Sequence, residues 1–540
     1  IHGAPRSFRG EAARLNHYLE RSRANGLAAN LLLSSHYCKH IPGDLKNARS
    51  PYAGHNNFDW NVLAPEAKEA FRRMYGNILP FLLEKPHLVS LGTANEPGYT
   101  VKSGSKEFER GFIGRLQEKY QTAAALNRAW GTRYAAVGDV TLRDALSPQA
   151  PPQARVDWAE YLSREVSLFY GFLKDRLLDA LPGKQVWVKL MGNLGYEMLD
   201  EADNIALGQN VAGSDSANEL WLDHLRSLFP GYPVTNHEWH FIRVEHTSDA
   251  PFLAMRMFQG VSRGLQSGNI WRGQRAQWDS KGYGHAESFS RYPVALNAIG
   301  RTSLKLRMLY PVLVRFRQLD GGAVRLYYDK NDQLLRPKEY PALLNAAYDR
   351  LRINPSGVRF LYPQTVTPEN LAKVKLVAAG SIRHIPAETA RTFAAWVAGG
   401  GTLYLQAPGE WSDYSGGKLD LPAGFRKAVT AAGVARYGKG TVVTVPGWEG
   451  DAALMSGPVA WSGSTPNREV ECRLPAAPDG APQYLSIVNL KGKVQKVRLR
   501  DGRTPQRITG KDLWNHADAA LDGEFELAPF EVRLIEVARP

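Results

Sequence analysis

From the start of the chain to about residue 320, one pattern repeats: an amphipathic helical stretch alternates with a short apolar run that ends in polar residues. Apolar runs of this kind are typical of parallel strands that are buried on both faces and joined by crossover helices. The number of repeats favours a (β/α) barrel over an open sheet, so the fold class is α/β. The candidate strands lie at 27–35, 88–91, 185–192, 210–216, 232–240 and 268–274.

These candidates give about six strands, whereas a closed barrel of this type has eight. We therefore expect an N-terminally incomplete barrel, whose first two strands would precede Ile1. No basic region followed by an apolar core opens the sequence, so we expect no targeting segment in it. The helices expected in this part lie at 8–25, 64–84, 156–181, 217–229 and 292–318.

After residue 320 the pattern changes twice. Strand candidates at 323–329, 358–363, 374–380 and 401–408 alternate with helical stretches, one of them at 387–398, which predicts a doubly wound α/β domain. Its Gly-rich stretch "AGGGT" precedes a strand, whereas a dinucleotide-binding loop follows one. Beyond 450, short alternating runs and turn residues predict a small antiparallel β-sandwich. The expected domains are 1–320, 321–450 and 451–540.

Composition excludes several classes of protein. The two cysteines, Cys38 and Cys472, are too few for a disulfide framework or a four-thiolate zinc site, and we expect Cys38 to be a packing residue. The net charge of +14 raises the question of nucleic acid, but basic residues are mixed with acids along the whole chain, so we expect no nucleic-acid partner. No apolar run reaches the roughly 18 to 20 residues of a membrane span, so we expect no membrane partner. The compartment stays open between the cytoplasm and secretion or the periplasm of a bacterium.

Two glutamates follow strand candidates at the positions where barrel enzymes carry their chemistry. Glu96 stands in "SLGTANEPGY", and Glu238, in "PVTNHEWHF", lies 142 residues later (238 minus 96). Two carboxylates from different strands suit glycoside hydrolysis, in which one protonates the leaving oxygen and the other attacks the anomeric carbon or activates water. A single glutamate at a strand end is most often a solvated loop residue, so the hypothesis depends on the pair and on its shared context.

Other polar and aromatic residues near the strand ends are candidates for substrate binding. Asn95 suits a sugar 2-hydroxyl, and tryptophan rings stack on the apolar faces of sugars. His237 and His240 could instead bind a metal, but a strand would point them to opposite faces, so we expect no metal and no cofactor. Trp130 and Trp187 are expected in the core. The substrate-binding candidates are Asn95, His36, Tyr37, Asp215, Trp239, His240 and Trp271, with Asn218 as a weaker one.

With these residues placed, the chain resembles the family 42 glycoside hydrolases, β-galactosidase-like enzymes of the clan A barrel glycosidases. The resemblance is carried by "LGTANEPGY", by "EKYQTAAALNRAWGTRY" at 118–134, by "PVTNHEWH" and by the stretch 375–405. It implies that Glu96 is the acid/base, that Glu238 is the nucleophile and that Asn95 contacts the 2-hydroxyl. It also implies a retaining double displacement on an oligosaccharide or β-galactoside.

The resemblance further implies that the middle domain has a class I amidotransferase-like fold and serves assembly into a homo-oligomer, a trimer or a dimer. This domain has no cysteine, which rules out amidotransfer by a cysteine nucleophile. The chain departs from the family in lacking the first two strands with their sugar-binding arginine, in lacking a four-cysteine zinc cluster, and in its "NHEWH" surroundings. The sugar and the linkage therefore stay open.

Two hypotheses about function follow. The first is a retaining exo-β-glycosidase of the β-galactosidase type; the alternative is a non-catalytic carbohydrate-binding or assembly protein on a degenerate barrel. A zinc hydrolase using His237 and His240 ranks below both. We favour the glycosidase because both Glu96 and Glu238 keep their local context.

Overall fold

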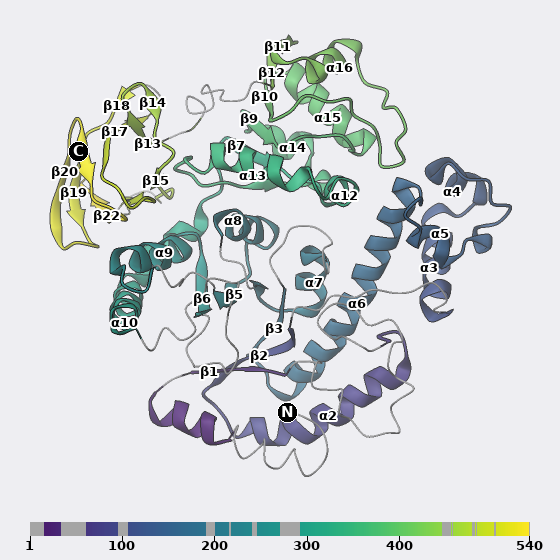
Figure 1. Cartoon of the computed structure of the whole chain (residues 1–540), viewed down its shortest axis with the longest axis horizontal. Coiled ribbons are helices and arrows are strands. Elements are labelled where there is room, and N and C mark those ends of the chain that lie inside the picture. Colours follow the sequence, from purple (N-terminus) through teal and green to yellow (C-terminus); the bar gives the residue numbers. More distant parts are fainter. Residues whose placement is uncertain are drawn as a thin grey trace. The chain divides into compact units, whose positions relative to one another are not determined.

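The structure is a computed structural model, shown in Figure 1. The described residues fall into two compact units, each treated by itself: unit 1 within Ile1–Asp215, Gly231–His237 and Tyr414–Gly416, and unit 2 within Ser216–Pro230, Glu238–Asp413 and Gly417–Pro540. The three-domain division stays a prediction. The structure describes residues 16–26, 28–33, 61–95, 106–190, 200–214, 218–239, 246–270, 292–444, 455, 457–477, 481, 483–501 and 504–538.

Unit 1 contains parallel strands at the predicted places. β1 (Ala29–Leu32), β2 (Leu88–Asn95) and β3 (Gln185–Lys189) pair in this order, all parallel. β4 (Ala212–Ser214) pairs in parallel with β5 (Val234–Trp239), whose first four residues belong to unit 1. The predicted alternation of buried parallel strands and helices is therefore confirmed within the described part of this unit.

Long helices cover one face of this sheet. α2 (Pro65–Leu83) and α6 (Pro152–Ala180) both have a proline in their first turn, where the missing N–H costs no hydrogen bond. Val186 and Val188 of β3 belong to one apolar cluster with side chains of both helices. Because side chains alternate along a strand, Trp187 and Lys189 lie on the opposite face of β3. The described part of unit 1 also contains helical residues 16–24, within the predicted helix 8–25, a 3₁₀ turn at Val137–Asp139, and the helices α3 (Lys106–Tyr120), α4 (Ala123–Trp130), α5 (Leu142–Leu146) and α7 (Glu201–Gly208).

The family-like stretch 118–134 is built around one buried carboxylate. Asp157 of α6 accepts hydrogen bonds from Lys119 Nζ, Tyr120 Oη and Trp130 Nε1, each at 2.7 Å. Trp130 is buried, as predicted. This stretch therefore joins α3, α4 and α6, and its described polar contacts are structural.

Unit 2 begins with α8 (Glu219–Leu228), where Asn218 Oδ1 accepts from the backbone N–H of Trp221 at 2.8 Å and so caps the helix. α9 (Ala250–Ser262) is followed by a turn at Arg263 and Gly264, where Gly264 has a φ of +100°, and β6 (Leu265–Ile270) begins earlier than predicted. The prediction of a single helix at 292–318 is wrong.

That predicted helix is broken into three pieces. α10 (Pro293–Met308) ends before α11 (Tyr310–Leu313), and a 3₁₀ turn follows at Val314–Gln318. The break comes at Pro311, which lacks a backbone N–H and clashes with the preceding helical turn.

A six-stranded sheet follows, in the order β11-β12-β10-β9-β7-β8. Its strands are parallel except the edge strand β11, which forms an antiparallel hairpin with β12 that was not predicted. The helix at 387–398 lies where the sequence places it. The elements are β7 (Val324–Tyr327), α12 (Lys330–Leu335), α13 (Tyr340–Leu351), β8 (Phe360–Leu361), α14 (Pro368–Leu371), β9 (Leu376–Ala379), α15 (Ala387–Ala398), β10 (Thr402–Leu405), α16 (Ala423–Thr430), β11 (Gly433–Tyr437) and β12 (Gly440–Thr444).

The C-terminal strands form two antiparallel sheets. One has the order β14-β13-β17-β18, with β21 also paired to β17, and the other has the order β15-β16-β22-β19-β20. Their shared core includes Cys472, Leu485, Val497 and Ile535. The strands are β13 (Pro458–Ser462), β14 (Thr465–Pro466), β15 (Val470–Arg473), β16 (Gln483–Asn489), β17 (Gln495–Asp501), β18 (Thr504–Pro505), β19 (Ile508–Asp512), β20 (Ala517–Leu521), β21 (Phe525–Leu527) and β22 (Val532–Val537).

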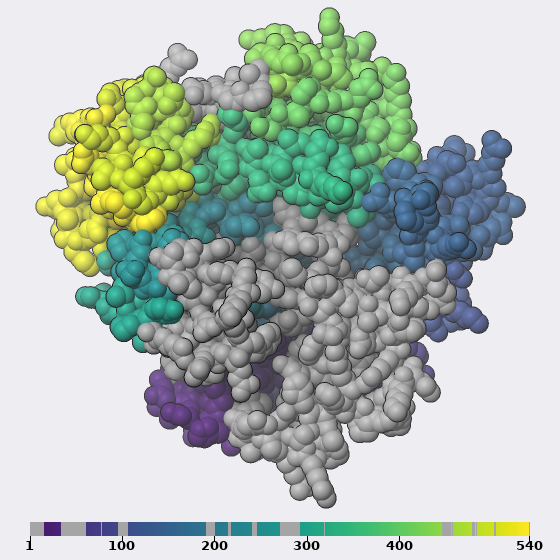
Figure 2. All heavy atoms as spheres, viewed as in Figure 1, coloured from purple at the N-terminus to yellow at the C-terminus, as the bar shows by residue number. Residues whose placement is uncertain are grey.

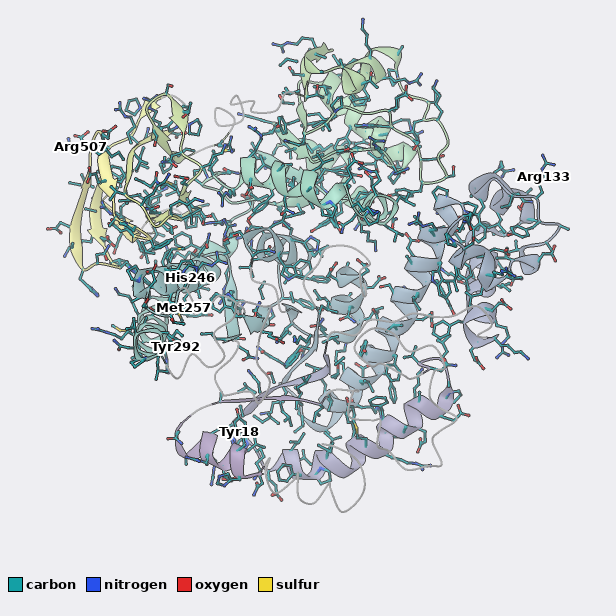
Figure 3. The ribbon with its side chains drawn as sticks, viewed as in Figure 1. Tyr18, Arg133, His246, Met257, Tyr292 and Arg507 are labelled. Atoms are coloured by element: carbon teal, nitrogen blue, oxygen red, sulfur yellow. The ribbon has the colours of Figure 1, made fainter. Side chains whose placement is uncertain are left out.

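Within unit 2, the helices that flank β6 adjoin the C-terminal sheets (Figure 2). Phe258 of α9 packs edge-on against Trp514, and Lys305 Nζ of α10 donates to the Trp514 carbonyl while lying 4.5 Å from the centre of its ring. Figure 3 labels Met257, a buried residue of α9. Among the described residues, no helix combines the length and apolar character needed to cross a bilayer.

Candidate active site

The structure describes a part of the predicted site. It gives the side chains of Glu238 and Trp239 and the backbone of Asn95. The other predicted residues lie outside the described residues, so the separation of the two carboxyl groups is left as a prediction. These residues are Glu96, His36, Tyr37, Asp215, His240 and Trp271.

Asn95 is the last residue of β2, and its Cα lies opposite that of Lys189 on β3. Lys189 is 4% exposed, so a cationic side chain is buried at the carboxyl end of this parallel sheet. The described strand thus ends where the Asn-Glu pair of the sequence begins, at the end of the strands where barrel enzymes act.

Within unit 1, two stacked aromatic residues lie on the face of the sheet opposite α2 and α6. The rings of Trp187 and His237 are stacked, with centroids 4.0 Å apart. Trp187 Nε1 donates to Ser90 Oγ at 3.2 Å, and His237 Nε2 lies 3.1 Å from Thr235 Oγ1. Trp187 is a core residue, as predicted, and it holds β2, β3 and β5 together.

Two glycines make room for this pair, and the sequence analysis did not identify them. A Cβ on Gly92 would lie 2.5 Å from the Trp187 ring, and one on Gly213 would lie 2.1 Å from His237 Nε2. The available signal was a glycine inside a strand, which often marks the close approach of another group.

The imidazole of His237 is electrically neutral in this environment. Burial lowers its pKa to about 3, and the positive charge of Lys189 contributes to the lowering. A histidine with this pKa carries no charge at neutral pH. In the described part of the chain, no group of three or more His, Cys, Asp or Glu side chains could hold a metal ion.

The candidate nucleophile lies at the end of β5, in unit 2. Glu238 is 8% exposed and Trp239 is 5% exposed. Sugar stacking by Trp239 stays a prediction; its described neighbours include the backbones of Gly260 on α9 and Gly268 on β6. A carboxylate is therefore buried at the carboxyl end of a strand, as a catalytic group of a barrel enzyme would be.

Sequence comparisons match a part of the chain, whereas structure comparisons match nearly all of it. The family model of glycoside hydrolase family 42, described as β-galactosidase, matches residues 41–219. A curated β-galactosidase of Thermus thermophilus is 26% identical over 244 residues, which make up 43% of this chain and 35% of that protein. The chain therefore spans about a third of the length of this relative.

Solved structures extend the likeness to nearly the whole chain. An exo-carrageenase of family 42 from Bacteroides ovatus has a TM-score of 0.71 at 16% identity, over 95% of this chain and 75% of that chain. A β-galactosidase from Bacillus circulans sp. alkalophilus has a TM-score of 0.71 at 14% identity, over 97% of this chain and 91% of that chain. At such low sequence identity, the structural likeness shows the fold alone, which is a barrel with additional domains. The resemblance to glycoside hydrolase family 42 that the sequence predicts is therefore confirmed, by sequence over residues 41–219 and by fold over nearly the whole chain.

Proposed function

We propose that this chain is a retaining exo-β-glycosidase that removes terminal β-linked galactose, with Glu238 as nucleophile and Glu96 as acid/base. The observation that carries the proposal is the burial of the Glu238 side chain at the carboxyl end of β5. The family match over residues 41–219 supports it, because this range contains Asn95 and Glu96.

The reaction would proceed in two displacements. Glu238 attacks the anomeric carbon while Glu96 gives its proton to the departing oxygen, so a glycosyl ester forms as the glycosidic bond breaks. Glu96 then takes a proton from water, which attacks the same carbon and releases Glu238. Asn95 would donate to the 2-hydroxyl, a contact that strengthens in the transition state.

The neutral ring pair supports this assignment of roles. Trp187 and His237 place no titrating charge behind the strand ends at neutral pH, because the pKa of His237 is about 3. The two carboxyl groups must differ in environment so that one starts protonated and the other ionised. Lys189 is buried on β3, with its Cα opposite that of Asn95, so it places a positive charge on the strand next to the one that leads to Glu96.

We also propose that the six-stranded sheet of the middle part serves assembly, with the amidotransferase-like fold that the resemblance implies. Light scattering on the purified chain would test assembly, since a dimer or a trimer is expected and a monomer would contradict it.

The decisive assay measures hydrolysis of aryl β-glycosides by the 540-residue chain and follows the first-formed sugar by proton NMR. The substrate panel includes β-galactosides and, because one fold neighbour is an exo-carrageenase, carrageenan oligosaccharides. We expect turnover of a β-galactoside with retention of the β-configuration. Inversion would recast Glu238 as a base.

Two variants then assign the residues. Glu238→Ala should lower kcat by at least about 10³-fold, and azide should restore turnover by attacking the anomeric carbon in place of the carboxylate. Glu118→Ala, on a side chain that is 72% exposed on α3, is the matched control and should keep wild-type kcat. Undiminished turnover in Glu238→Ala, or sugar binding by the wild type without turnover, would contradict the proposal.

A further inference from the structure

The ring of Trp239 fills a slot between α9 and β6. A Cβ on Gly260 of α9 would lie 2.8 Å from ring atom Cζ2, and a Cβ on Gly268 of β6 would lie 2.7 Å from ring atom Cε3. The ring therefore rests directly on the backbone of both elements. Since Trp239 follows Glu238 on β5, a shift of this slot moves the end of the strand that carries the candidate nucleophile.

Two residues, Arg263 and Gly264, make the turn from α9 to β6. Gly264 has a φ of +100°, a conformation that favours glycine. The backbone N–H of Arg263 lies 3.2 Å from the carbonyl oxygens of both Gln259 and Gly260. The position of α9 relative to β6, the two elements that line the slot, therefore depends on the position of this turn.

The turn is held by the guanidinium group of Arg263, which is fully buried. Its Nη1 donates to Asp223 Oδ2 on α8 at 2.5 Å and to Tyr348 Oη on α13 at 2.8 Å, and its Nη2 donates to Glu471 Oε2 on β15. Three elements, the last of them in the C-terminal sheets, thus converge on one side chain of the turn.

Of these three partners, Glu471 is the farthest from Arg263 in the sequence, and its carboxyl group is ionised. It is 2% exposed and also accepts from Arg473 Nε at 2.8 Å. Burial by itself raises the pKa of Glu471, but the charges of Arg263 and Arg473 outweigh it and bring the pKa to about 2. Pairing with Val488 in the antiparallel sheet fixes the backbone of Glu471.

Asp223 alone would not replace Glu471 as an anchor. Arg226 Nη2 lies 3.0 Å from Asp223 Oδ1, and Arg473 Nη2 lies 3.7 Å from Asp223 Oδ2. Without the charge of Glu471, Asp223 would be the one carboxylate within hydrogen-bonding or ion-pair distance of the three buried guanidinium groups in the described part of this cluster, and Glu219 would act on Arg263 through space alone. A buried charge that loses its partner is costly, so the turn would move to relieve it.

We propose that Glu471 is a positioning residue for Glu238: through Arg263 it fixes the turn between α9 and β6, and this turn holds Trp239 and the end of β5. The catalytic part of this proposal rests on the proposed function of Glu238. The C-terminal sheets would then complete the wall behind the nucleophile strand.

The first test is Glu471→Gln, which keeps the shape of the side chain and removes its charge. Active sites are counted by trapping with a 2-deoxy-2-fluoro-glycoside, so that kcat is expressed per folded site. We expect kcat per site to fall about tenfold or more, with KM within about threefold, because a small displacement of a reacting group has large kinetic effects. Glu469→Gln, which removes a surface partner of Lys493, is the control and should keep wild-type kcat.

A second variant keeps the proposal falsifiable if Glu471→Gln does not fold. Gly268 is exposed, so Gly268→Ala should fold while its new methyl group pushes the Trp239 ring. The control is Gly300→Ala on α10, where a Cβ would meet nothing within 4 Å. We expect the same loss of kcat per site in Gly268→Ala and none in Gly300→Ala; wild-type kcat in Gly268→Ala would overturn the proposal.

Hydrogen exchange separates this proposal from the proposed function, because it needs no activity. Glu471→Gln, or Gly268→Ala where the first variant does not fold, should speed amide exchange in 260–268 and 234–239 while leaving 185–189 unchanged. Unchanged exchange in 234–239 would overturn the link to β5 even if the wild type hydrolyses every substrate. Faster exchange there, in a chain without turnover, would uphold the link and contradict only the glycosidase.

Discussion

The rings of Trp187 and His237 lie stacked in unit 1, with centroids 4.0 Å apart and planes 9° apart. The two residues belong to β3 and β5, and Gly213 of β4 lies against the imidazole. The pair fills the face of the strands opposite α6 with a dense neutral layer. The pair joins β3 to β5 and contacts β2 through Ser90, so its packing should govern the stability of this sheet in unit 1.

Gly213→Ala tests the packing of the ring pair. The added Cβ would lie 2.1 Å from His237 Nε2 and 2.5 Å from Thr235 Oγ1, so the rings must shift. We expect the free energy of unfolding to fall by about 1–3 kcal/mol, as measured by urea denaturation. The control is Gly114→Ala in α3, where a Cβ meets nothing within 4 Å and should raise stability by about 0.5–1 kcal/mol. Equal effects of the two variants would contradict the interpretation.

Asp157→Ala tests whether the family-like stretch 118–134 is structural. The variant leaves Tyr120 Oη and Trp130 Nε1 without their common acceptor, and each unsatisfied buried group costs about 1–3 kcal/mol. We expect a loss of about 3 kcal/mol in unfolding free energy.

Two further variants sharpen the Asp157 experiment. Asp157→Asn keeps one carbonyl acceptor and should lose less stability. Glu160→Ala removes a carboxylate 3.5 Å from Lys119 that is 39% exposed, and it should change stability by less than about 0.5 kcal/mol. A loss in Glu160→Ala as large as that in Asp157→Ala would show that Lys119, rather than the shared acceptor, is decisive.

Local sequence signals were sufficient to predict the strands β1 to β6 and the helices α2, α6 and α8 of the barrel part, but not the helices α3, α4, α5, α7 and α9. Apolar runs and proline or glycine boundaries lie within a few neighbouring residues, which is why α2 and α15 were predicted to within a residue. The errors also have local causes: Pro311 broke the helix predicted at 292–318, and the left-handed Gly264 moved β6.

The contacts within the site could not be predicted in the same way. The stack of Trp187 on His237 joins two strands, and the pair of Arg263 with Glu471 joins residues 208 positions apart. No periodicity in the sequence encodes which distant side chains meet. The glutamate at the end of β5 was identified because its signal, a carboxylate after an apolar strand, is local.

The last prediction concerns His224 on α8, which packs against Tyr362 and Phe360 in unit 2. Burial lowers the pKa of its imidazole from 6.5 to about 3. At a pH between these two pKa values, residue 224 binds a proton in the unfolded chain but not in the folded chain. The unfolding free energy should therefore fall as the pH falls, by about 1.4 kcal/mol per pH unit from this residue.

His224→Phe removes this titration, while Tyr362 Oη keeps its hydrogen bond to the carbonyl oxygen of residue 224. Urea unfolding of both proteins at pH 7, 6 and 5 isolates the effect, because all other titrating groups are shared. We expect the stability of the wild type relative to the variant to decrease by about 2 kcal/mol from pH 7 to pH 5. His224→Gln, which also has no titrating group at this position, should show the same pH dependence of stability as His224→Phe. A difference that stays constant with pH would show that the imidazole titrates alike in the folded and unfolded chains, and that its burial is not what controls its charge.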